Sequence, residues 1–469
     1  MSEFRFGAAP RPDVDDPVDE ADPSAGGEAL DRGRLVGELD AGLAFFSPVS
    51  VQGRVNHAVG QILNATGIRA RLGEICELRT PNQPTLLAEV VGFSRQTTLL
   101  TPLGEVAGLS PETTVVPSGR EHVFAVGRGL FGRVLDGLGQ PLDGRGPVAG
   151  AVWVSTQQNP PNPLARQMID TPFATGVRVI DGLMTLGVGQ RVGIFAPSGV
   201  GKSTLLGMIA RGAQADVNVI ALVGERGREV REFIEHSLSP EVRARSIVVV
   251  STSDRPAMER VKSALVATAI AEYFRDEGQR VLLLVDSLTR FARAQREVGL
   301  ASGEPPTRRS FPPSTFAVLP RLLERAGQGE RGSITALYTV LVEGDEESDP
   351  IAEEVRSILD GHIVLSRKIA LANRYPAIDV LASLSRVMPL VASRAHQMGA
   401  ARVRELLAKY QEIELLVQIG EYREGSDRLG DLALRARDLL GAFCMQTGSE
   451  DIRFEETLAR LIKLANDHA

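Results

Sequence analysis

The sequence predicts an α/β protein that has a helix-covered parallel β-sheet at its centre, a small β-barrel before it and a helical domain after it. Between about residues 176 and 391, apolar strand-like runs alternate with amphipathic helical segments, which is typical of parallel sheets. Short β-branched stretches separated by turn residues precede this region. Apolar residues at three- and four-residue steps follow it. At roughly 100–200 residues per domain, 469 residues allow two to four domains.

Composition and charge exclude several classes of protein. Hydrophobic residues make up 43% of the chain and charged residues 24%, which excludes collagen-like, fibrous and wholly disordered chains. The longest apolar runs, such as residues 281–285, are far shorter than the roughly 18–20 residues that cross a bilayer. Residues 1–17 lack the basic and apolar regions of a secretory signal. We therefore expect a cytoplasmic protein with no transmembrane segment.

Cysteines and net charge restrict the chemistry further. Cys76 and Cys444 match no metal-ligand spacing, so we interpret both as small buried residues. The net charge of −7 argues against duplex binding, because duplex-binding domains carry basic surfaces. Residues 1–34 are acidic and contain few large apolar side chains. This segment is predicted to be a disordered tail, either simply solvated or docking a partner.

The remaining elements follow in chain order. Turn residues separate short β-branched stretches and predict a small barrel or sandwich, at residues 49–55, 68–78, 86–93 and 97–100. The glycine-rich stretch 126–144 is interpreted as a connector into the next domain. Strands of the central sheet are expected at residues 191–195, 217–223, 247–251, 281–285 and 334–342. A helix is expected at residues 258–274, because Gly278 follows it as a stop signal, and helices are expected from about residue 398 onward.

The strongest chemical signal is the glycine-rich stretch from Ala196 to Thr204, which directly follows a predicted strand and precedes the predicted helix 205–211. Glycines let the backbone curl so that its N–H groups point at phosphate oxygens, and the helix N-terminus adds a favourable field. In such loops the lysine, here Lys202, reaches the β- and γ-phosphates, and the hydroxyl of Ser203 binds Mg²⁺. Ala196 replaces the usual glycine but still fits a tight turn. The predicted phosphate-binding residues are Ser198, Gly199, Val200, Gly201, Lys202, Ser203 and Thr204.

Two carboxylates follow other predicted strands. Asp286 ends an apolar strand, the position expected for a carboxylate that holds Mg²⁺ through water beside a phosphate loop. Glu225 follows the neighbouring strand and is the predicted general base for the attacking water, with Arg226 beside it to hold phosphate oxygens. Glu229 is interpreted instead as a helix-start carboxylate. The sequence therefore predicts hydrolysis of a nucleotide.

Hydrolysis of this kind also uses a transition-state arginine, which a neighbouring subunit often supplies. The two candidates are Arg367 in the segment 365–368 and Arg386 at the end of the segment 376–386. Their spacing in the sequence does not choose between them.

Together these motifs resemble those of the rotary ATP synthase and secretion ATPase superfamily. The match runs from about residue 128 to residue 386 and rests on the glycine-rich loop, on residues 224–226, on residues 286–290 and on residues 376–385. Within that superfamily, type III protein export ATPases are the most similar, in residues 303–306, 339–345, 358–367 and 419–422. The injectisome branch resembles the chain more than the flagellar branch does, in residues 254–260, 264–268 and 354–358.

The resemblance implies a Mg²⁺-dependent ATPase that forms a homohexameric ring at the cytoplasmic face of the inner membrane. The ring would release chaperones from exported proteins and unfold those proteins, with stator proteins, central-stalk proteins and chaperone–effector complexes as partners and no direct contact with nucleic acid. The implied division is an acidic tail, a β-barrel, a RecA-like nucleotide-binding domain and a helical domain, at residues 1–34, 35–116, 117–397 and 398–469.

The resemblance also assigns roles to single residues. Glu225 activates water, Asp286 supports the metal and Arg386 is the arginine finger that enters the neighbouring site. Tyr375 stacks on adenine, for which an aromatic platform is well suited, and Phe443 closes the base pocket.

Three alternatives remain at this point. The first is a flagellar export ATPase. The second is an ATP synthase catalytic subunit, which should carry a strongly acidic loop for its stalk where this chain has residues 419–425. The third is a hexameric nucleic-acid motor, which needs basic pore loops and aromatic residues in the barrel; the barrel region has no lysine and contains only Phe45, Phe46 and Phe93 as aromatics.

Overall fold

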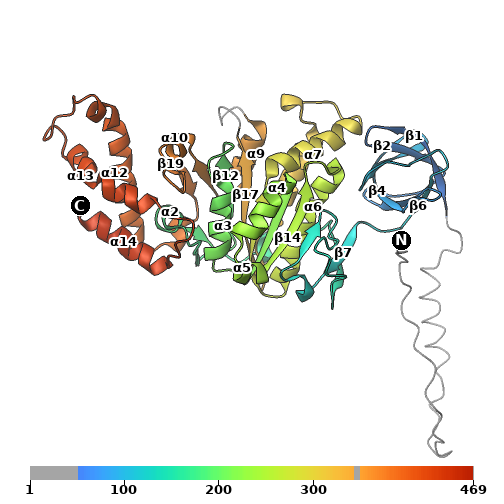
Figure 1. Ribbon diagram of the computed structural model, residues 1–469, viewed down its shortest axis with the longest axis horizontal. Helices are drawn as coiled ribbons and strands as arrows, with labels where there is room; N and C mark the ends of the chain where they lie inside the picture. The colour runs from blue at the N-terminus through green and yellow to red at the C-terminus, as the bar shows by residue number, and fades with distance from the viewer. Residues whose placement is uncertain (1–50, 343–348, 468–469) are drawn as a thin grey trace, which may run out of the picture. The chain divides into compact units, whose positions relative to one another are not determined.

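The computed structural model describes residues 51–342 and 349–467 (Figure 1). The predicted acidic tail, residues 1–34, lies outside the described residues, and so do Phe45 and Phe46. Within the two described ranges, no helix is both long and apolar enough to cross a membrane.

The predicted barrel is confirmed as a closed antiparallel barrel with the strand order β1-β2-β5-β4-β3-β6. Side chains alternate between the two faces of a strand, and Val55, Leu78 and Leu100 fill its interior. Residues 62–66 were not expected as a strand, because Asn64 interrupts a short apolar run; pairing with both β1 and β5 forms it. The strands are β1 (Gly53–Val59), β2 (Ile62–Thr66), β3 (Ile75–Arg79), β4 (Leu86–Ser94), β5 (Thr97–Pro102) and β6 (Thr114–Pro117).

Short elements lead from the barrel to the main sheet. They are β7 (Val123–Val126), η1 (Arg128–Leu130), β8 (Val134–Asp136), β9 (Val152–Ser155), η2 (Pro163–Ala165), β10 (Pro172–Phe173), α2 (Arg178–Leu183) and β11 (Leu186–Gly187). The stretch 126–144 is more than the connector that its glycines suggested. Its strand β8 pairs in parallel with β14 and forms one edge of the main sheet. Three residues of strand are too short to stand out among turn residues in the sequence.

The central sheet has the order β19-β18-β12-β17-β15-β13-β14-β8, with β16 beside β17. Neighbours on this path are parallel except β18 and β19, so the predicted, mostly parallel sheet is confirmed. The five expected strands are β12 (Arg191–Ala196), β13 (Val217–Glu225), β14 (Ser246–Thr252), β15 (Arg280–Asp286) and β17 (Ser333–Leu341). Three further strands were not expected besides β8: β16 (Gly327–Gln328), β18 (Gly361–Leu365) and β19 (Ile378–Ser385).

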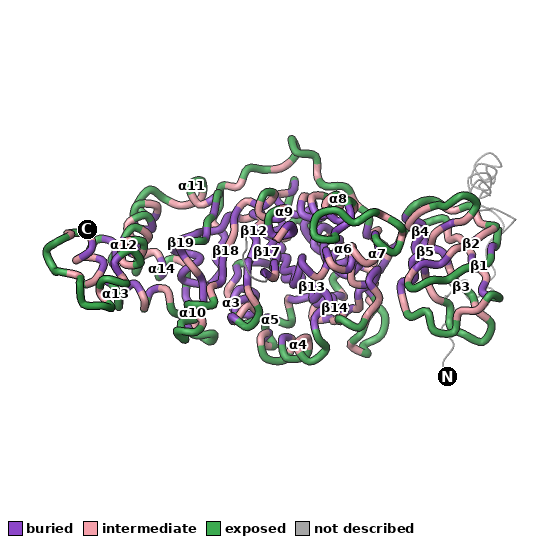
Figure 2. The backbone as a smooth tube through the Cα atoms, turned by 90° about the horizontal axis from the view of Figure 1, so that it is seen from above, coloured by how far each residue is buried: buried purple, intermediate pink, exposed green. Residues whose placement is uncertain are grey.

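Helices cover both faces of the sheet, and the buried strands form the centre of the molecule's core (Figure 2). Along β13, Val219 and Ala221 pack into one apolar cluster and Ile220 into the other, as the two-residue period of a strand requires. The first face is covered by α6 (Ala257–Asp276), α7 (Leu288–Ala301), α8 (Pro313–Leu323) and α9 (Pro350–Ile358). The second face is covered by α2, α3 (Lys202–Gly212), α4 (Gly227–Glu232), η3 (Phe233–Ser237) and α5 (Pro240–Ala244). The predicted helix 258–274 is confirmed as α6.

The C-terminal region is helical, as predicted. Its first long helix begins at Arg394, slightly before the predicted start, because the Ser393 side chain accepts a hydrogen bond from the His396 N–H (3.3 Å) and caps the helix. The remaining helices are η4 (Arg308–Ser310), α10 (Arg367–Leu371), α11 (Met388–Val391), α12 (Arg394–Gln418), α13 (Arg428–Cys444) and α14 (Phe454–Asp467).

Polar contacts join these parts. The Lys262 ammonium on α6 is buried and lies 2.5 Å from the Glu89 carboxylate on barrel strand β4. At the other end, the Arg178 guanidinium on α2 donates to the carbonyl oxygens of Ala442 (2.9 Å) and Met445 (3.0 Å), and so satisfies the C-terminus of α13. The C-terminal helices are thereby tied directly to helix α2, which packs on the central sheet.

Candidate active site

The glycine-rich loop joins β12 to α3 at the carboxyl edge of the sheet. Gly199 and Gly201 have φ angles of +81° and +84°, a conformation that residues with a Cβ rarely adopt. Val200, between them, points into the core, while Ser203 and Thr204 in the first turn of α3 are exposed. The loop and the N-terminus of α3 therefore line the pocket in which the sequence places a phosphate.

Lys202 and Asp286 meet in front of this loop. The Lys202 ammonium contacts Asp286 Oδ1 directly, and the Thr339 hydroxyl donates to the same oxygen at 2.7 Å. Both members of the Lys202–Asp286 pair are largely buried, so each neutralises the charge of the other. A phosphate that enters the loop can take the place of the carboxylate as the partner of Lys202.

Glu225 ends β13 beside this pair. Its Oε1 lies 3.5 Å from the Lys202 ammonium, and its Oε2 lies 3.1 Å from the Arg290 guanidinium. Burial and the charge of Asp286 raise the pKa of Glu225 from 4.5 to about 7. A hydrogen bond with Glu229 acts in the same direction, while Lys202 and Arg290 oppose it. A carboxylate with a pKa near neutrality is suited to take a proton from an attacking water.

A pocket of about 700 Å³ lies in front of the loop and of Glu225. Arg226 lines it with a side chain that is 75% exposed and lies 3.2 Å from Glu229. Arg290, which was not predicted from the sequence as a site residue, also lines the pocket and donates to the Gly224 carbonyl oxygen. The signal was available, because Arg290 stands four residues after Asp286, one turn into a helix that begins at the carboxyl edge of the sheet.

The oxygen donors at the loop suit Mg²⁺, which prefers hydroxyl, carboxylate and phosphate oxygens and retains several waters. The Ser203 hydroxyl and the Asp286 carboxylate are the protein groups that would hold it. In the described part of the chain, no group of three or more His, Cys, Asp and Glu side chains could hold a metal by itself.

Tyr375 lies against the phosphate loop. Its ring is within 3.2–3.3 Å of the position that a Cβ on Gly201 would occupy, and it remains 40% exposed. The Gln446 N–H donates to the Tyr375 carbonyl oxygen (2.9 Å), and its buried side-chain amide donates to the Gly176 carbonyl oxygen (2.8 Å). These bonds fix the chain around an accessible aromatic ring next to the loop. Gln446 was not found from the sequence, because its partners are remote along the chain.

The structure does not bring Phe443 to this site. Phe443 is 5% exposed and packs in the apolar core, where its ring lies 2.8 Å from the position of a Cβ on Gly182. It lies on α13 and faces α2. In this structure Phe443 has a packing role, and closure of a base pocket by its ring stays a prediction.

The two candidate finger arginines lie at opposite ends of the parallel strands. Arg386 lies at the amino ends and Arg367 at the carboxyl ends. Arg386 follows β19, which is antiparallel to β18, so that Ser385 pairs with Gly361 at the amino end of β18. The phosphate loop follows the carboxyl end of β12, which is parallel to β18. The five residues of β18 separate its amino end from its carboxyl end by roughly 16 Å, at about 3.3 Å per residue. Arg386 is exposed and does not line the pocket of its own subunit. Arg367 follows the carboxyl end of β18, and it is likewise exposed outside the pocket.

Comparison with known proteins gives the family. The nucleotide-binding and β-barrel domains of the ATP synthase alpha/beta family match residues 176–385 and 55–119, and the T3SS EscN ATPase C-terminal domain matches residues 392–463. The type 3 secretion system ATPase of Xanthomonas euvesicatoria is 61% identical over 417 residues, covering 88% of this chain and 94% of the relative. The chain belongs to the type III secretion ATPase family.

Other relatives agree with this family assignment. The flagellum-specific ATP synthase of Bacillus subtilis is 51% identical to this secretion ATPase over 417 residues, covering 88% of this chain and 95% of the relative. The assembled ATPase EscN from the enteropathogenic E. coli type III secretion system has a TM-score of 0.84 at 49% identity, covering 88% of this chain and all of that one. EscN in complex with its central stalk EscO matches with a TM-score of 0.82 at 48% identity and the same coverage.

Proposed function

We propose that this chain is the ATP-hydrolysing motor of a type III protein export apparatus, in which hydrolysis drives the release of chaperones and the unfolding of exported proteins. The observation that carries the proposal is the meeting of Lys202, Glu225 and Asp286 at the phosphate loop of a chain in this family. The four-part division at residues 34, 116 and 397 belongs to the proposal.

The chemistry follows from the contacts of the chain's own residues. The loop N–H groups and Lys202 bind the β- and γ-phosphates, and Lys202 exchanges Asp286 for a phosphate when ATP enters. Glu225 then accepts the proton of the attacking water, and Arg226 holds phosphate oxygens. Mg²⁺ on Ser203 and Asp286 would neutralise charge on the phosphates. Tyr375 provides the surface on which adenine stacks.

Arg386 completes the site of a neighbouring subunit in this proposal. Arg386 lies at the amino ends of the parallel strands, away from the phosphate loop of its own subunit. In a ring where this end of each subunit faces the ATP site of the next, Arg386 can contact the nucleotide bound there. The EscN structure is described as an assembled ATPase, which supports an oligomer. We propose a homohexamer with Arg386 as the finger.

The proposed partners and location follow the same logic. A central stalk is supported by the structure of EscN with EscO, and we add stator proteins and chaperone–effector complexes as partners. The proposed location is the cytoplasmic face of the inner membrane, to which the ring binds peripherally. Residues 1–34 are the proposed docking segment for a stator, with the barrel as the other surface for that role.

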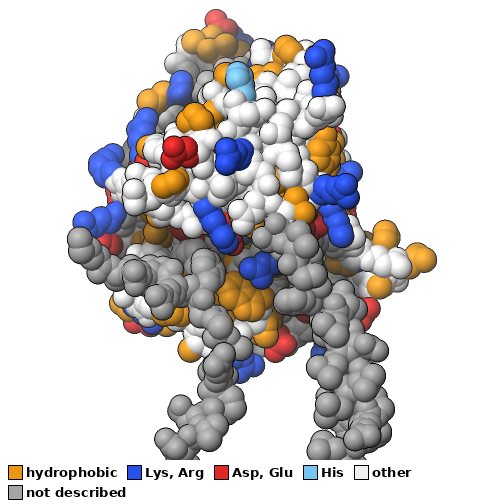
Figure 3. Space-filling model, turned by 90° about the vertical axis from the view of Figure 1, so that its right-hand side faces the viewer, with side chains coloured by type: hydrophobic (Ala, Val, Ile, Leu, Met, Phe, Trp, Pro, Cys, Tyr) orange, Lys and Arg blue, Asp and Glu red, His pale blue; other side chains and the backbone are white. Residues whose placement is uncertain are grey.

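The alternative functions are less well supported. Identity is 61% to the Xanthomonas secretion ATPase and 51% to the Bacillus flagellar enzyme, which favours the injectisome branch. The match of residues 392–463 to the EscN C-terminal domain argues against an ATP synthase catalytic subunit. A nucleic-acid motor would need several stacking aromatics on its barrel. Among the described residues of the barrel, Phe93 is the only Phe, Tyr or Trp, and it is 57% exposed. On the face shown in Figure 3, Lys and Arg side chains are scattered among apolar and acidic ones.

The function predicts that the purified ring releases a substrate from its chaperone. With a chaperone–substrate pair of the same secretion system, release should be faster with ATP and Mg²⁺ than with either alone. Lys202→Ala should bind the pair equally well and release nothing beyond the rate without ATP, because the variant lacks the phosphate contact. Separation of bound and free substrate by size-exclusion chromatography measures this. Equal release by the wild type and Lys202→Ala would contradict the proposed coupling.

A further inference from the structure

The main chain around Arg386 packs closely against two neighbouring segments, although the Arg386 side chain is exposed. The Arg386 N–H donates to the Asp360 carbonyl oxygen at 3.0 Å. The start of β18 is so close that a Cβ on Gly361 would meet the Leu384 carbonyl oxygen at 2.6 Å. On the other side, a Cβ on Gly187 would meet the Val387 side chain at 2.7 Å. The main chain of Arg386 is therefore fixed while its side chain is exposed, as expected for a residue that contacts another subunit.

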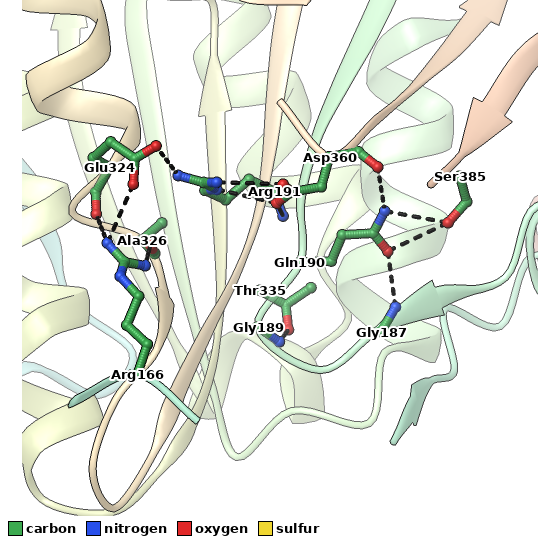
Figure 4. Close-up of polar contacts among 10 residues, drawn as sticks. All are labelled: Arg166, Gly187, Gly189, Gln190, Arg191, Glu324, Ala326, Thr335, Asp360 and Ser385. Atoms are coloured by element: carbon green, nitrogen blue, oxygen red, sulfur yellow. Dashed lines mark hydrogen bonds and ion pairs between the residues drawn. The ribbon is translucent and has the colours of Figure 1, made fainter. Parts of the chain in front are cut away.

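The fully buried amide of Gln190 joins these segments (Figure 4). Its Nε2 donates to the Asp360 carbonyl oxygen (3.0 Å) and to the Ser385 hydroxyl (3.2 Å), while its Oε1 accepts from the Gly187 N–H (2.9 Å). The Ser385 hydroxyl donates to the Thr185 carbonyl oxygen at 2.8 Å. One side chain thus fixes the residue before Arg386 and the carbonyl group that receives the Arg386 N–H.

Asp360 is itself held by the first residue of β12. The Arg191 Nε lies 3.1 Å from Asp360 Oδ2, and its Nη2 lies 3.3 Å from Asp360 Oδ1. Two parallel contacts of this kind fix orientation as well as distance. Arg191 Nη1 lies 2.6 Å from the Glu324 carboxylate, which is also contacted by Arg166. The Arg191 side chain is 14% exposed, so the pair is screened much less than a surface pair.

We propose that Gln190, Arg191 and Asp360 form a polar clamp that sets the position from which Arg386 reaches the neighbouring ATP site. The three are positioning residues, because none of them lines the pocket of its own subunit. The proposal rests on the proposed function of Arg386 in a shared site. In this arrangement a single strand, β12, serves two ATP sites. Its carboxyl end carries the phosphate loop of its own subunit, and its amino end positions the finger that enters the next subunit's site.

Mixed rings test the clamp. An acceptor subunit with Arg386→Ala keeps its own site but lacks the finger, and a donor subunit with Lys202→Ala has no active site but keeps the finger. Random equal mixing should restore about a quarter of the wild-type ATPase rate, because half of the subunits are acceptors and half of those adjoin a donor. Asp360→Ala in the donor should lower this restored rate at least about tenfold, a loss of ~1.4 kcal/mol of transition-state stabilisation. The same change in the acceptor should leave the restored rate within about twofold.

Further variants separate positioning from folding. Asp360→Asn in the donor retains one acceptor for Arg191 and should recover part of the rate. Gln190→Met removes the buried hydrogen bonds at similar length and should repeat the Asp360→Ala loss in donors only. Asp216→Ala is the matched control, because it removes an exposed ion pair with Arg280 (3.4 Å) and a hydrogen bond from the Arg280 N–H (2.8 Å) far from Arg386, and it should leave the restored rate unchanged. Ring mass by light scattering and thermal unfolding are measured for every mixture.

The outcomes distinguish the two proposals. Full restoration by donors that carry Asp360→Ala and by those that carry Gln190→Met would overturn the clamp and leave the shared site standing. Equal loss from donor and acceptor would overturn the clamp as well, because it would indicate a general effect on folding or on a subunit's own site. Absence of restoration by the unmodified donor, in rings of normal mass, would overturn the shared site and the clamp with it.

Discussion

Glu225→Gln is expected to lower kcat for ATP hydrolysis about 10²–10⁴-fold, the usual contribution of a general base. The amide has the size of the carboxylate and can still contact Lys202 and Arg290, so binding of ATP should change little. Stopped-flow binding of a fluorescent ATP analogue together with phosphate release separates the two quantities. Glu235→Gln, which changes an exposed glutamate paired with Arg231 at 2.9 Å on the surface, is the matched control and should retain the wild-type rate.

The pH profile gives the same prediction a second readout. The pKa of Glu225 is raised to about 7, so the carboxylate needed as base is lost as the pH falls through 7. The wild-type kcat/KM should therefore decrease below pH 7, approaching tenfold per unit. The residual rate of Glu225→Gln should lack this decrease. Because the nucleotide titrates equally in both assays, the pH profile of the variant serves as the reference for the wild type. A small effect of the substitution, or the same acid limb in both proteins, would assign the base to another group.

Arg386→Ala is expected to reduce kcat by about 10³-fold or more, the value of an arginine that stabilises the transition state. Nucleotide binding in the variant should be nearly normal, because Arg386 lies at the edge of the sheet opposite its own phosphate loop. Arg367→Ala is the matched control and should retain most of the activity. Steady-state hydrolysis by rings of verified mass measures both variants. The reverse order of the two effects would make Arg367 the finger.

Local patterns in the sequence were sufficient for much of the fold and for the phosphate site. The strands β12, β13 and β15 are strongly apolar runs. Glu225 and Asp286 end β13 and β15, and Lys202 begins the helix that follows the loop after β12. Because parallel strands bring their carboxyl ends to one edge, residues far apart in the sequence could be expected to meet there. The structure brings these three side chains together.

The rest depends on contacts that no local pattern encodes. Strand β19 is antiparallel to β18, and this reversal alone moves Arg386 to the opposite edge from Arg367. Phe443 stands at a helical core spacing, which does not tell a packing ring from a ring over a base; that the ring lies against Gly182 is seen only in the structure. The clamp joins Gln190, which precedes a strand, to Asp360, which precedes another 170 residues later. Pairings of this kind are set by the register of the whole sheet.

The central claim is a shared-site ATPase, and the most direct test is Mg²⁺-dependent ATP hydrolysis as a function of protein concentration. Molecular mass is measured by light scattering on the same samples, and Lys202→Ala provides the blank. Hydrolysis per subunit is expected to rise as rings form, because an isolated subunit lacks the finger in its own site. A specific activity that stays constant across the dilution at which rings dissociate would contradict the shared site.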